Sequence, residues 1–282
     1  MKSLVCLFAL LLPAAAMANP GDDPAWSRPS APYHVIGNIY NVGTEGVAIY
    51  LIDTGKGLIL LDSGPENTQA IVEGNIRTLG FRLKDVKYII ETHAHYDHVG
   101  SMAAMKNDTG AIFIASRADH WALENGRRDG DNIYGPGPFP PVKVDRVIAD
   151  GAKLMLGNSV LTAHLTPGHT RGDTSWTMTV RDKGRPLKVL FFGSTTTAGN
   201  VLVGNKVYPG IVKDYRATFA KLEKIHPDVF LANHPVFANM AGKRKAQIAG
   251  NPDAFIDRDG FPAFLAQSEN DFEAELKKEG GQ

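Results

Sequence analysis

The stretch from Glu91 to Gly100, ETHAHYDHVG, constrains this chain more than any other, because three histidines and an aspartate fall within six positions. These are ligand types that bind a divalent metal such as zinc, and neither a turn nor core packing requires them together. The four candidates are His93, His95, Asp97 and His98. The apolar run from Val86 to Glu91 precedes them and predicts a buried strand, at whose carboxyl end layered α/β folds hold ligands. The sequence therefore predicts a metal site at a strand end.

The spacing of these residues favours two metal ions. His93 and His95 are two positions apart, so in an extended segment their side chains point the same way and can reach one ion. Asp97 and His98 are adjacent and would diverge in an extended segment, but at the turn into a following helix they could serve a second ion. Paired metals about 3.5 to 4 Å apart recur in hydrolases.

Two later histidines complete the candidate set. His169 stands in the strand-to-loop segment TPGHTRGDT, and His234 follows the apolar strand Val229 to Leu231. Each of them alone would more often be a hydrogen-bonded structural residue. Six candidates at the ends of separate strands make a metal site the favoured interpretation. The remaining histidines, to which we assign structural or surface roles, are His34, His120, His164 and His226.

The order of elements predicts an α/β protein in which two sheets pack face to face with helices outside. The predicted strands are Tyr33 to Tyr40, Val47 to Asp53, Gly57 to Asp62, Val86 to Glu91, Ala111 to Ala115, Arg146 to Ile148, Lys153 to Leu156, Val160 to Leu165, Ser175 to Val180, Lys188 to Phe192 and Val229 to Leu231. The predicted helices are Glu66 to Leu79, Ser101 to Lys106, Ser116 to Asn125 with Ser116 as N-cap, Asp214 to Ile225, and most of the tail from Asn239. The Gly- and Pro-rich stretch from Asp129 to Pro141 predicts a long loop, which such folds often use functionally. No linker divides residues 19–282, so we expect a single domain.

The first 18 residues have the pattern of a secretory signal peptide. Lys2 is followed by the apolar run Leu4 to Leu12 and by a small-x-small cleavage signal ending at Ala18. The only cysteine, Cys6, lies inside this leader, so the mature chain can form neither a disulfide nor a thiolate ligand. We expect a periplasmic protein that starts near Asn19.

The charge balance excludes some partners. Lysine and arginine together number 30, as do aspartate and glutamate, so no basic field points to nucleic acid. We expect a small-molecule substrate, a monomer, and no membrane anchoring once the leader is removed.

These motifs, HAHYDH, TPGHTRGDTSW and the strand-terminal His234, resemble the metallo-β-lactamase superfamily over essentially the whole mature chain. The resemblance implies an αββα four-layer sandwich with a binuclear site at one edge. Lactonase-like and glyoxalase II-like members carry a metal-bridging aspartate after the strand corresponding to Lys188 to Phe192, and two β-lactamase subclasses carry a cysteine ligand. Here that position is Ser194, which resembles the third subclass of class B β-lactamases. A second serine common in that subclass is Thr196 here.

The resemblance implies a zinc-dependent β-lactamase that opens the lactam ring of penicillins, cephalosporins and carbapenems by attack of a zinc-bound hydroxide, and so confers antibiotic resistance. Two Zn²⁺ per chain are implied, the first bound by His93, His95 and His169 and the second by Asp97, His98 and His234. Asp97 would also orient the nucleophile. By the same analogy, Ser194 and Thr196 would bind the substrate carboxylate. We further expect Asp62 and Asp173 to orient ligand histidines, although turn capping is nearly as plausible for both. The alternatives are a lactone or thioester metallohydrolase and a zinc-dependent binding protein without turnover.

Overall fold

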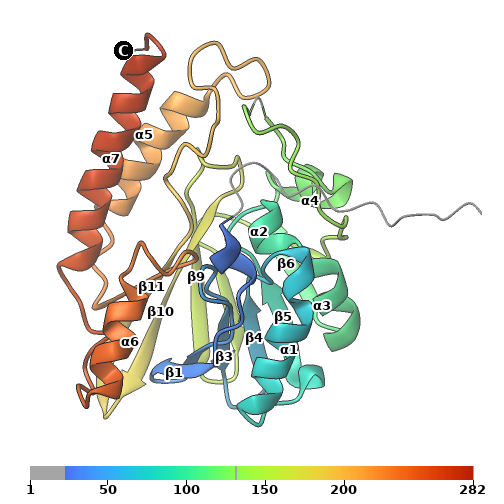
Figure 1. Ribbon diagram of the computed structural model, residues 1–282, viewed down its shortest axis with the longest axis vertical. Coiled ribbons are helices and arrows are strands. Elements are labelled where there is room, and N and C mark those ends of the chain that lie inside the picture. The colour runs from blue at the N-terminus through green and yellow to red at the C-terminus, as the bar shows by residue number, and fades with distance from the viewer. Residues whose placement is uncertain (1–22, 131, 282) are drawn as a thin grey trace, which may run out of the picture.

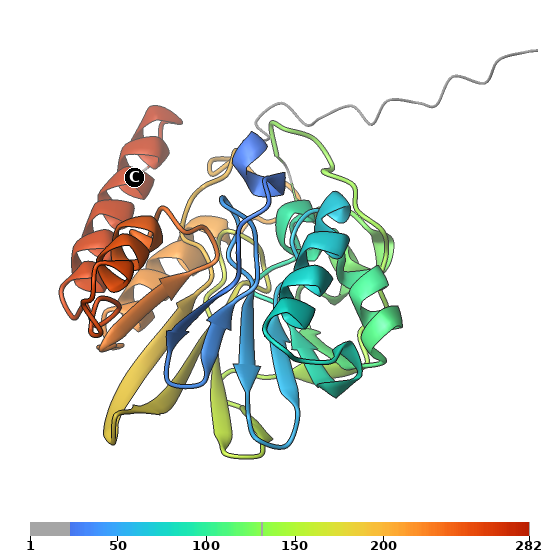
Figure 2. The same cartoon turned by 60° about the horizontal axis from the view of Figure 1, so that its bottom comes forward.

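Two mixed β-sheets pack face to face with helices on both outer sides (Figure 1), which confirms the predicted fold class. The structure is a computed structural model and describes residues 23–130 and 132–281. The predicted signal peptide lies outside the described residues. In the turned view of Figure 2 the two sheets form the centre, with one group of helices on each flank. In the part of the chain described here, no helix is both long and apolar enough to cross a membrane.

The first sheet has seven strands in the order β1 to β7. Its antiparallel half is a meander of β1 (Tyr33–Ile36), β2 (Ile39–Asn41), β3 (Tyr50–Asp53) and β4 (Leu58–Leu61). The parallel half adds β5 (Val86–Ile90), β6 (Ile112–Ser116) and β7 (Arg146–Ile148). The carboxyl ends of β4 and β5 therefore meet at the same edge.

The second sheet has five strands in the order β12, β11, β10, β9, β8. They are β8 (Lys153–Leu156), β9 (Ser159–Leu165), β10 (Thr174–Asp182), β11 (Arg185–Phe192) and β12 (Val229–Ala232). Only the β11–β12 pair is parallel, so both of these strands end at one edge of the sheet. The loop from β9 to β10 lies at the same edge, because β10 runs antiparallel to β11 and begins where β11 ends.

Helices cover both outer faces (Figure 1). The first sheet carries α1 (Gln69–Thr78), α2 (Tyr96–Val99), α3 (Met102–Thr109) and α4 (His120–Asn125), and the second carries α5 (Ile211–Leu222), α6 (Met240–Ile248) and α7 (Gly260–Lys278). Three short 3₁₀ helices are η1 (Pro24–Ser27), η2 (Glu66–Thr68) and η3 (Leu83–Asp85).

Strand β4 shows why this sequence forms a layered core. All four of its residues, LILL, are buried, but they face two ways. Ile59 and Leu61 belong to the apolar cluster shared with the second sheet, whereas Leu58 and Leu60 pack into the cluster under the first group of helices. A strand covered on both faces needs such a continuous apolar run, because successive side chains alternate between the faces.

Several predicted elements differ from the structure at their end residues, such as the helix predicted over Asp214 to Ile225, which is α5, and two differ in more than that. The single strand expected from Tyr33 to Tyr40 is a hairpin, because Gly37 adopts a φ of 57° and turns the chain between β1 and β2. The helix expected to start at Ser116 starts at His120 instead. Ser116 still pairs with β7, and its hydroxyl accepts a hydrogen bond from the Asp119 N–H in the turn that follows.

Candidate metal centre

The six metal-ligand candidates come together at the edge where the strands of both sheets end. His93 and His95 follow β5, and the short helix α2 carries Asp97 and His98. His169 lies in the β9–β10 loop and His234 directly follows β12. The candidates form two trios, and within each trio the potential ligand atoms lie within 4.8 Å of one another.

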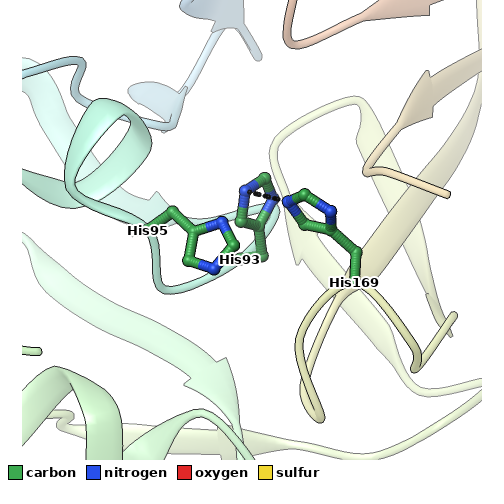
Figure 3. A group of neighbouring side chains, drawn as sticks. All are labelled: His93, His95 and His169. Carbon is green, nitrogen blue, oxygen red and sulfur yellow. Dashed lines mark hydrogen bonds between the residues drawn. The ribbon is translucent and has the colours of Figure 1, made fainter. Parts of the chain in front are cut away.

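The first trio consists of His93, His95 and His169 (Figure 3), which point toward one another from the two sheets. The Nε2 atoms of His93 and His169 are 3.1 Å apart. Tetrahedral zinc with Zn–N bonds of about 2.0 to 2.1 Å separates its ligands by roughly 3.4 Å. The spacing therefore suits two nitrogens that share one ion.

The second trio consists of Asp97, His98 and His234. The Nε2 atoms of the two histidines are 3.3 Å apart, and Asp97 Oδ2 lies 3.2 Å from His98 Nε2 and 3.3 Å from His234 Nε2. The rings of His93 and His98 have centroids 4.3 Å apart, so the two trios are neighbours. This arrangement suits a binuclear site.

Carbonyl groups fix the tautomers of two histidines. His169 Nδ1 lies 2.7 Å from the Thr196 carbonyl oxygen, and His234 Nδ1 lies 3.1 Å from the Gly46 carbonyl oxygen. Because a carbonyl only accepts, each Nδ1 must carry the proton, which leaves the Nε2 lone pair aimed into the trio. Backbone partners of this kind orient metal-binding histidines.

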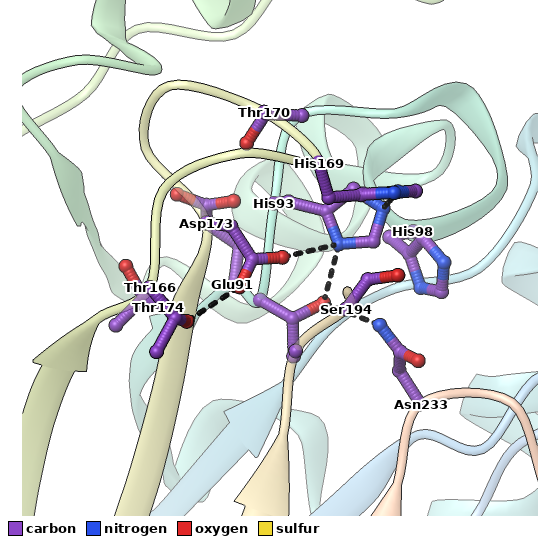
Figure 4. A network of polar contacts seen from close by, with 12 residues as sticks. Glu91, His93, His98, Thr166, His169, Thr170, Asp173, Thr174, Ser194 and Asn233 are labelled. Carbon is purple, nitrogen blue, oxygen red and sulfur yellow. Dashed lines mark hydrogen bonds and ion pairs between the residues drawn. The ribbon is translucent and has the colours of Figure 1, made fainter. Parts of the chain in front are cut away.

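Two carboxylates face the Nδ1 atoms of His93 and His98. Asp62 Oδ2 lies 3.4 Å from His98 Nδ1, and Asp62 also accepts hydrogen bonds from the N–H and hydroxyl of Thr92. Asp173 Oδ2 faces His93 Nδ1 at 3.5 Å (Figure 4) and makes no hydrogen bond within the described residues. Both aspartates are buried. Carboxylates can orient metal-binding histidines from this side of the ring, and the orienting roles of Asp62 and Asp173 stay predictions.

The protonation states suit metal binding. Burial lowers the pKa of His93 and of His95 well below 6.5 and that of His169 to about 4, so all three are neutral at pH 7. Burial also opposes charge on Asp97 and His98, but their mutual attraction outweighs it. The pKa of Asp97 is held well below its usual range and that of His98 is raised to about 10. The first trio thus offers three neutral nitrogen ligands. In the second trio Asp97 and protonated His98 form an ion pair, and a metal ion can take the place of the His98 proton.

The donor set fits zinc better than a hard cation. Five imidazoles and one carboxylate make up the trios, whereas magnesium and calcium prefer oxygen ligands. The lone pairs of His93 and His169 also face each other, an unfavourable contact unless a cation or a proton lies between them. The residues present therefore suit a metal centre.

Asp119 is a site residue that sequence reasoning missed. Its carboxylate accepts hydrogen bonds from the N–H groups of Ala94 and Gly172 and from the Thr170 hydroxyl. Burial raises its pKa to about 6. Asp119 therefore cross-links the loop that carries His93 and His95 to the loop that carries His169. Its position inside a predicted helix gave no signal for this role.

A cavity of about 350 Å³ opens over the two trios. Arg128 lines it with a guanidinium group, and its aromatic wall residues are Trp26, Tyr96, Tyr134 and Phe237. Tyr134 comes from the predicted 129–141 loop, which therefore does form one wall, whereas Phe139 of that loop is buried elsewhere.

The two predicted substrate-binding residues differ in their access to this cavity. Thr196 lines it, whereas Ser194 is 2% exposed and lies behind Thr196, with the two hydroxyl oxygens 3.1 Å apart. Their roles toward a substrate remain predictions.

Known proteins with similar sequences and structures agree with this architecture. The family model described as the metallo-beta-lactamase superfamily matches residues 42–234. BJP-1, a subclass B3 metallo-β-lactamase of Bradyrhizobium japonicum, is 44% identical with a TM-score of 0.87, and the match covers 91% of this chain and 97% of that one. FEZ-1, a metallo-β-lactamase from Legionella gormanii, is 35% identical with a TM-score of 0.87 over 91% of this chain and 99% of that one.

Curated relatives are more distant. An N-acyl homoserine lactonase from a Bacillus species is 28% identical over 45% of this chain and 55% of its own length. The chain spans about half the length of the curated relatives it matches. The family match, the αββα layers and the paired trios agree, and the chain belongs to the metallo-β-lactamase superfamily, where its solved relatives include the enzymes of subclass B3.

Proposed function

We propose that this chain is a zinc-dependent β-lactamase that hydrolyses the lactam amide of penicillins, cephalosporins and carbapenems and so confers antibiotic resistance. The observation that carries the proposal is the second trio, in which Asp97, His98 and His234 converge without a further carboxylate. At the end of β11, where lactonase-like members of the superfamily place a bridging aspartate, this chain has the buried Ser194. The extended similarity to BJP-1 supports the same reaction.

We propose two zinc ions per chain, one in each trio. When bound, they would supply a water molecule whose pKa is lowered to about 7 and would polarise the lactam carbonyl. Asp97 is ionised at neutral pH, because the attraction of His98 and His234 outweighs its burial. Its carboxylate can therefore accept a hydrogen bond from the attacking water and orient it. No covalent intermediate with a serine is needed.

The cavity suits a small amphipathic substrate. Trp26 forms part of its wall from the N-terminal segment, and its ring lies 5.3 Å from the His234 ring. Together with Tyr96 and Phe237 it offers apolar surface for an acyl side chain. Thr196 offers a hydroxyl, and Arg128 offers a positive charge, to which the substrate carboxylate can bind.

We further propose that residues 1–18 are a signal peptide and that the mature domain, residues 19–282, works in the periplasm. The apolar leader and the small-x-small signal ending at Ala18 support this. Mass spectrometry of the protein isolated from the periplasm of an expressing bacterium should give a mature N-terminus near Asn19. Retention of Met1 in a cytoplasmic fraction would contradict the proposal.

A substrate panel tests the proposed reaction. Purified zinc-loaded protein should hydrolyse a penicillin and a carbapenem, and EDTA should abolish that turnover. The same preparation is offered a homoserine lactone and a lactoylglutathione thioester. Turnover of the lactone or thioester without turnover of either β-lactam would show that the chain is a different metallohydrolase. No turnover of any substrate, with zinc still bound, would favour a binding protein.

Matched histidine variants separate the metal site from general effects. His169→Ala should abolish hydrolysis of the β-lactams. His164→Ala is the control, because the half-buried His164 contacts the Thr177 hydroxyl on β10 and belongs to neither trio. It should retain nearly all activity. Equal activity of the two variants would show that the first trio is not needed for the reaction.

A further inference from the structure

Two loops that are far apart in sequence are joined beside the cavity by a pair of asparagines, Asn132 and Asn200. Asn132 belongs to the loop after α4, and Asn200 belongs to the loop after β11. The two residues form an isolated β-bridge, and the amide Nδ2 of Asn132 donates to Asn200 Oδ1 at 3.1 Å. Figure 1 shows both loops, green and tan, at the upper end of the molecule. We call this pair the asparagine clasp.

Asn132 uses both ends of its side chain in the clasp. The Nδ2 group donates to Asn200 Oδ1 and to the Ala198 carbonyl oxygen at 2.8 Å. The Oδ1 atom accepts from Arg128 Nη1 at 3.1 Å and from the Tyr134 N–H at 2.9 Å. A neutral amide can make four such bonds, so its capacity is filled. A residue with this many partners fixes the conformation of its loop.

Asn200 continues the connection to a metal-ligand candidate. Its Nδ2 group donates to the backbone carbonyl oxygen of His169 at 2.9 Å. In addition, the Ile133 N–H donates to the Gly199 carbonyl oxygen at 2.9 Å. The loop around Asn132 is therefore tied to the His169 backbone through a single side chain.

The two loops are also in close van der Waals contact. Gly199 has a φ of 75°, and a Cβ atom at this position would lie 2.5 Å from the Tyr134 ring. Tyr134 and Arg128 both line the cavity over the trios. Arg128 is held in turn by Asn132 Oδ1 and by the Gly135 carbonyl oxygen. The clasp thus fixes the two side chains that form this wall of the cavity.

We propose that Asn132 and Asn200 are positioning residues that hold the Tyr134–Arg128 wall at a fixed distance from the metal centre. Neither contacts the reacting atoms. A fixed wall lowers the ordering cost when a bulky acyl side chain binds against it, so the clasp determines how well large substrates bind. A small substrate that does not reach the wall gains nothing from it. The kinetic part of this inference rests on the proposed β-lactamase activity.

The test compares Asn132→Ala, Asn200→Ala and the double variant with the wild-type holoenzyme. Asn158→Ala is the matched control, because Asn158 is an exposed asparagine in the β8–β9 turn. Hydrogen–deuterium exchange at residues 132–137 and 198–200 should rise in all three clasp variants and not in the control. Zinc content should stay at the wild-type value.

The KM for a β-lactam with a bulky acyl group should rise about ten-fold with kcat within about two-fold, because part-buried hydrogen bonds are lost. The KM for a small β-lactam should change less than about two-fold.

Two further variants isolate the hydrogen bonds. Asn132→Asp keeps the size and the acceptor oxygen but removes the donor, so it should behave like Asn132→Ala. The double variant should be no worse than the single variants, because both residues act through one connection.

Three results would overturn the proposal. Unchanged exchange in both single variants would show that the clasp does not hold the loop. Increased exchange with an unchanged KM for the bulky substrate would show a structural role only. An equal rise in KM for both substrates would show a general defect of the site. If the wild-type protein hydrolyses no β-lactam, the proposed function fails, whereas the exchange measurement still decides whether the clasp holds the loop.

Discussion

Replacing Asp62 by asparagine tests whether this carboxylate prepares His98 for metal binding. Asp62 has a φ of 65°, a left-handed conformation that asparagine tolerates well, so the substitution adds little backbone strain. Its Oδ2 atom faces His98 Nδ1 at 3.4 Å, which favours a proton on Nδ1 and leaves Nε2 free as a ligand. An asparagine NH₂ group in that place faces the same N–H. Two donors then face each other, which favours the His98 tautomer with its proton on Nε2. In that tautomer Nε2 cannot bind a metal ion.

The expected cost follows from these contacts. Loss of an orienting partner of this kind typically reduces metal affinity about 10- to 100-fold, equivalent to about 1.4 to 2.7 kcal/mol. With the NH₂ group in the place of Oδ2, the Thr92 N–H keeps a neutral acceptor in Oδ1, whereas the Thr92 hydroxyl loses its acceptor. This change should lower the free energy of unfolding of the zinc-free protein by about 2 kcal/mol. The zinc of the second trio should be affected, because His98 belongs to that trio.

Competition with a chromophoric chelator measures both zinc affinities, and urea unfolding of EDTA-treated protein measures the stability. Asp53→Asn is the matched control, because Asp53 lies at the opposite end of the antiparallel β3–β4 pair and its carboxylate accepts from the Gly55 N–H. The control should retain wild-type affinities. If Asp62→Asn binds both zinc ions within about two-fold of wild type, Asp62 does not orient His98 and the reasoning is wrong.

Three more predictions concern the same centre. His169→Ala should bind about one zinc fewer per chain, measured by metal analysis after dialysis, and full stoichiometry would refute the assignment. In zinc-free protein the pKa of His98 is about 10 against an ordinary 6.5, so the stability from its proton is complete below pH 6.5 and lost as the pH rises toward 10. A melting temperature of EDTA-treated protein that does not fall between pH 7 and 10 would contradict this. Asp119→Asn turns one acceptor into a donor facing the Gly172 N–H, so urea unfolding should show a loss of about 2 kcal/mol, and an unchanged midpoint would show that the bond contributes nothing.

Much of the fold could be predicted because the apolar residues of a sequence show which segments are buried. The apolar run that became β5 predicted a buried strand, and β5 lies inside the first sheet with Val86, Ile89 and Ile90 buried. The predictions were wrong where one residue or one strand partner determines whether a segment continues as a strand, turns or becomes a helix. Gly37 splits one predicted strand into a hairpin, and pairing with β7 keeps Ser116 in a strand instead of a helix. Such choices depend on tertiary partners, which a local pattern does not contain.

The metal centre was predictable for a different reason. His93 and His95 were predicted to reach one ion from their spacing, and they lie together in the first trio with ring centroids 4.8 Å apart. Asp97 and His98 were expected to serve a second ion at the turn into a helix, and the short helix α2 places them in the second trio. Histidine is an uncommon and chemically distinctive residue, so several histidines at the ends of predicted strands indicate a metal site from the sequence alone.

The residues that hold this centre in place carry no such signature. Asp119 and Asn200 act on backbone groups, accepting from the N–H groups of Ala94 and Gly172 and donating to the carbonyl of His169. Every residue except proline offers the same N–H and every residue offers the same carbonyl, so nothing in the sequence marks the partner. A polar side chain whose role is to connect two loops becomes visible only when the fold brings them together. Substitutions at these two positions are therefore the sharpest test of what the structure adds to the sequence.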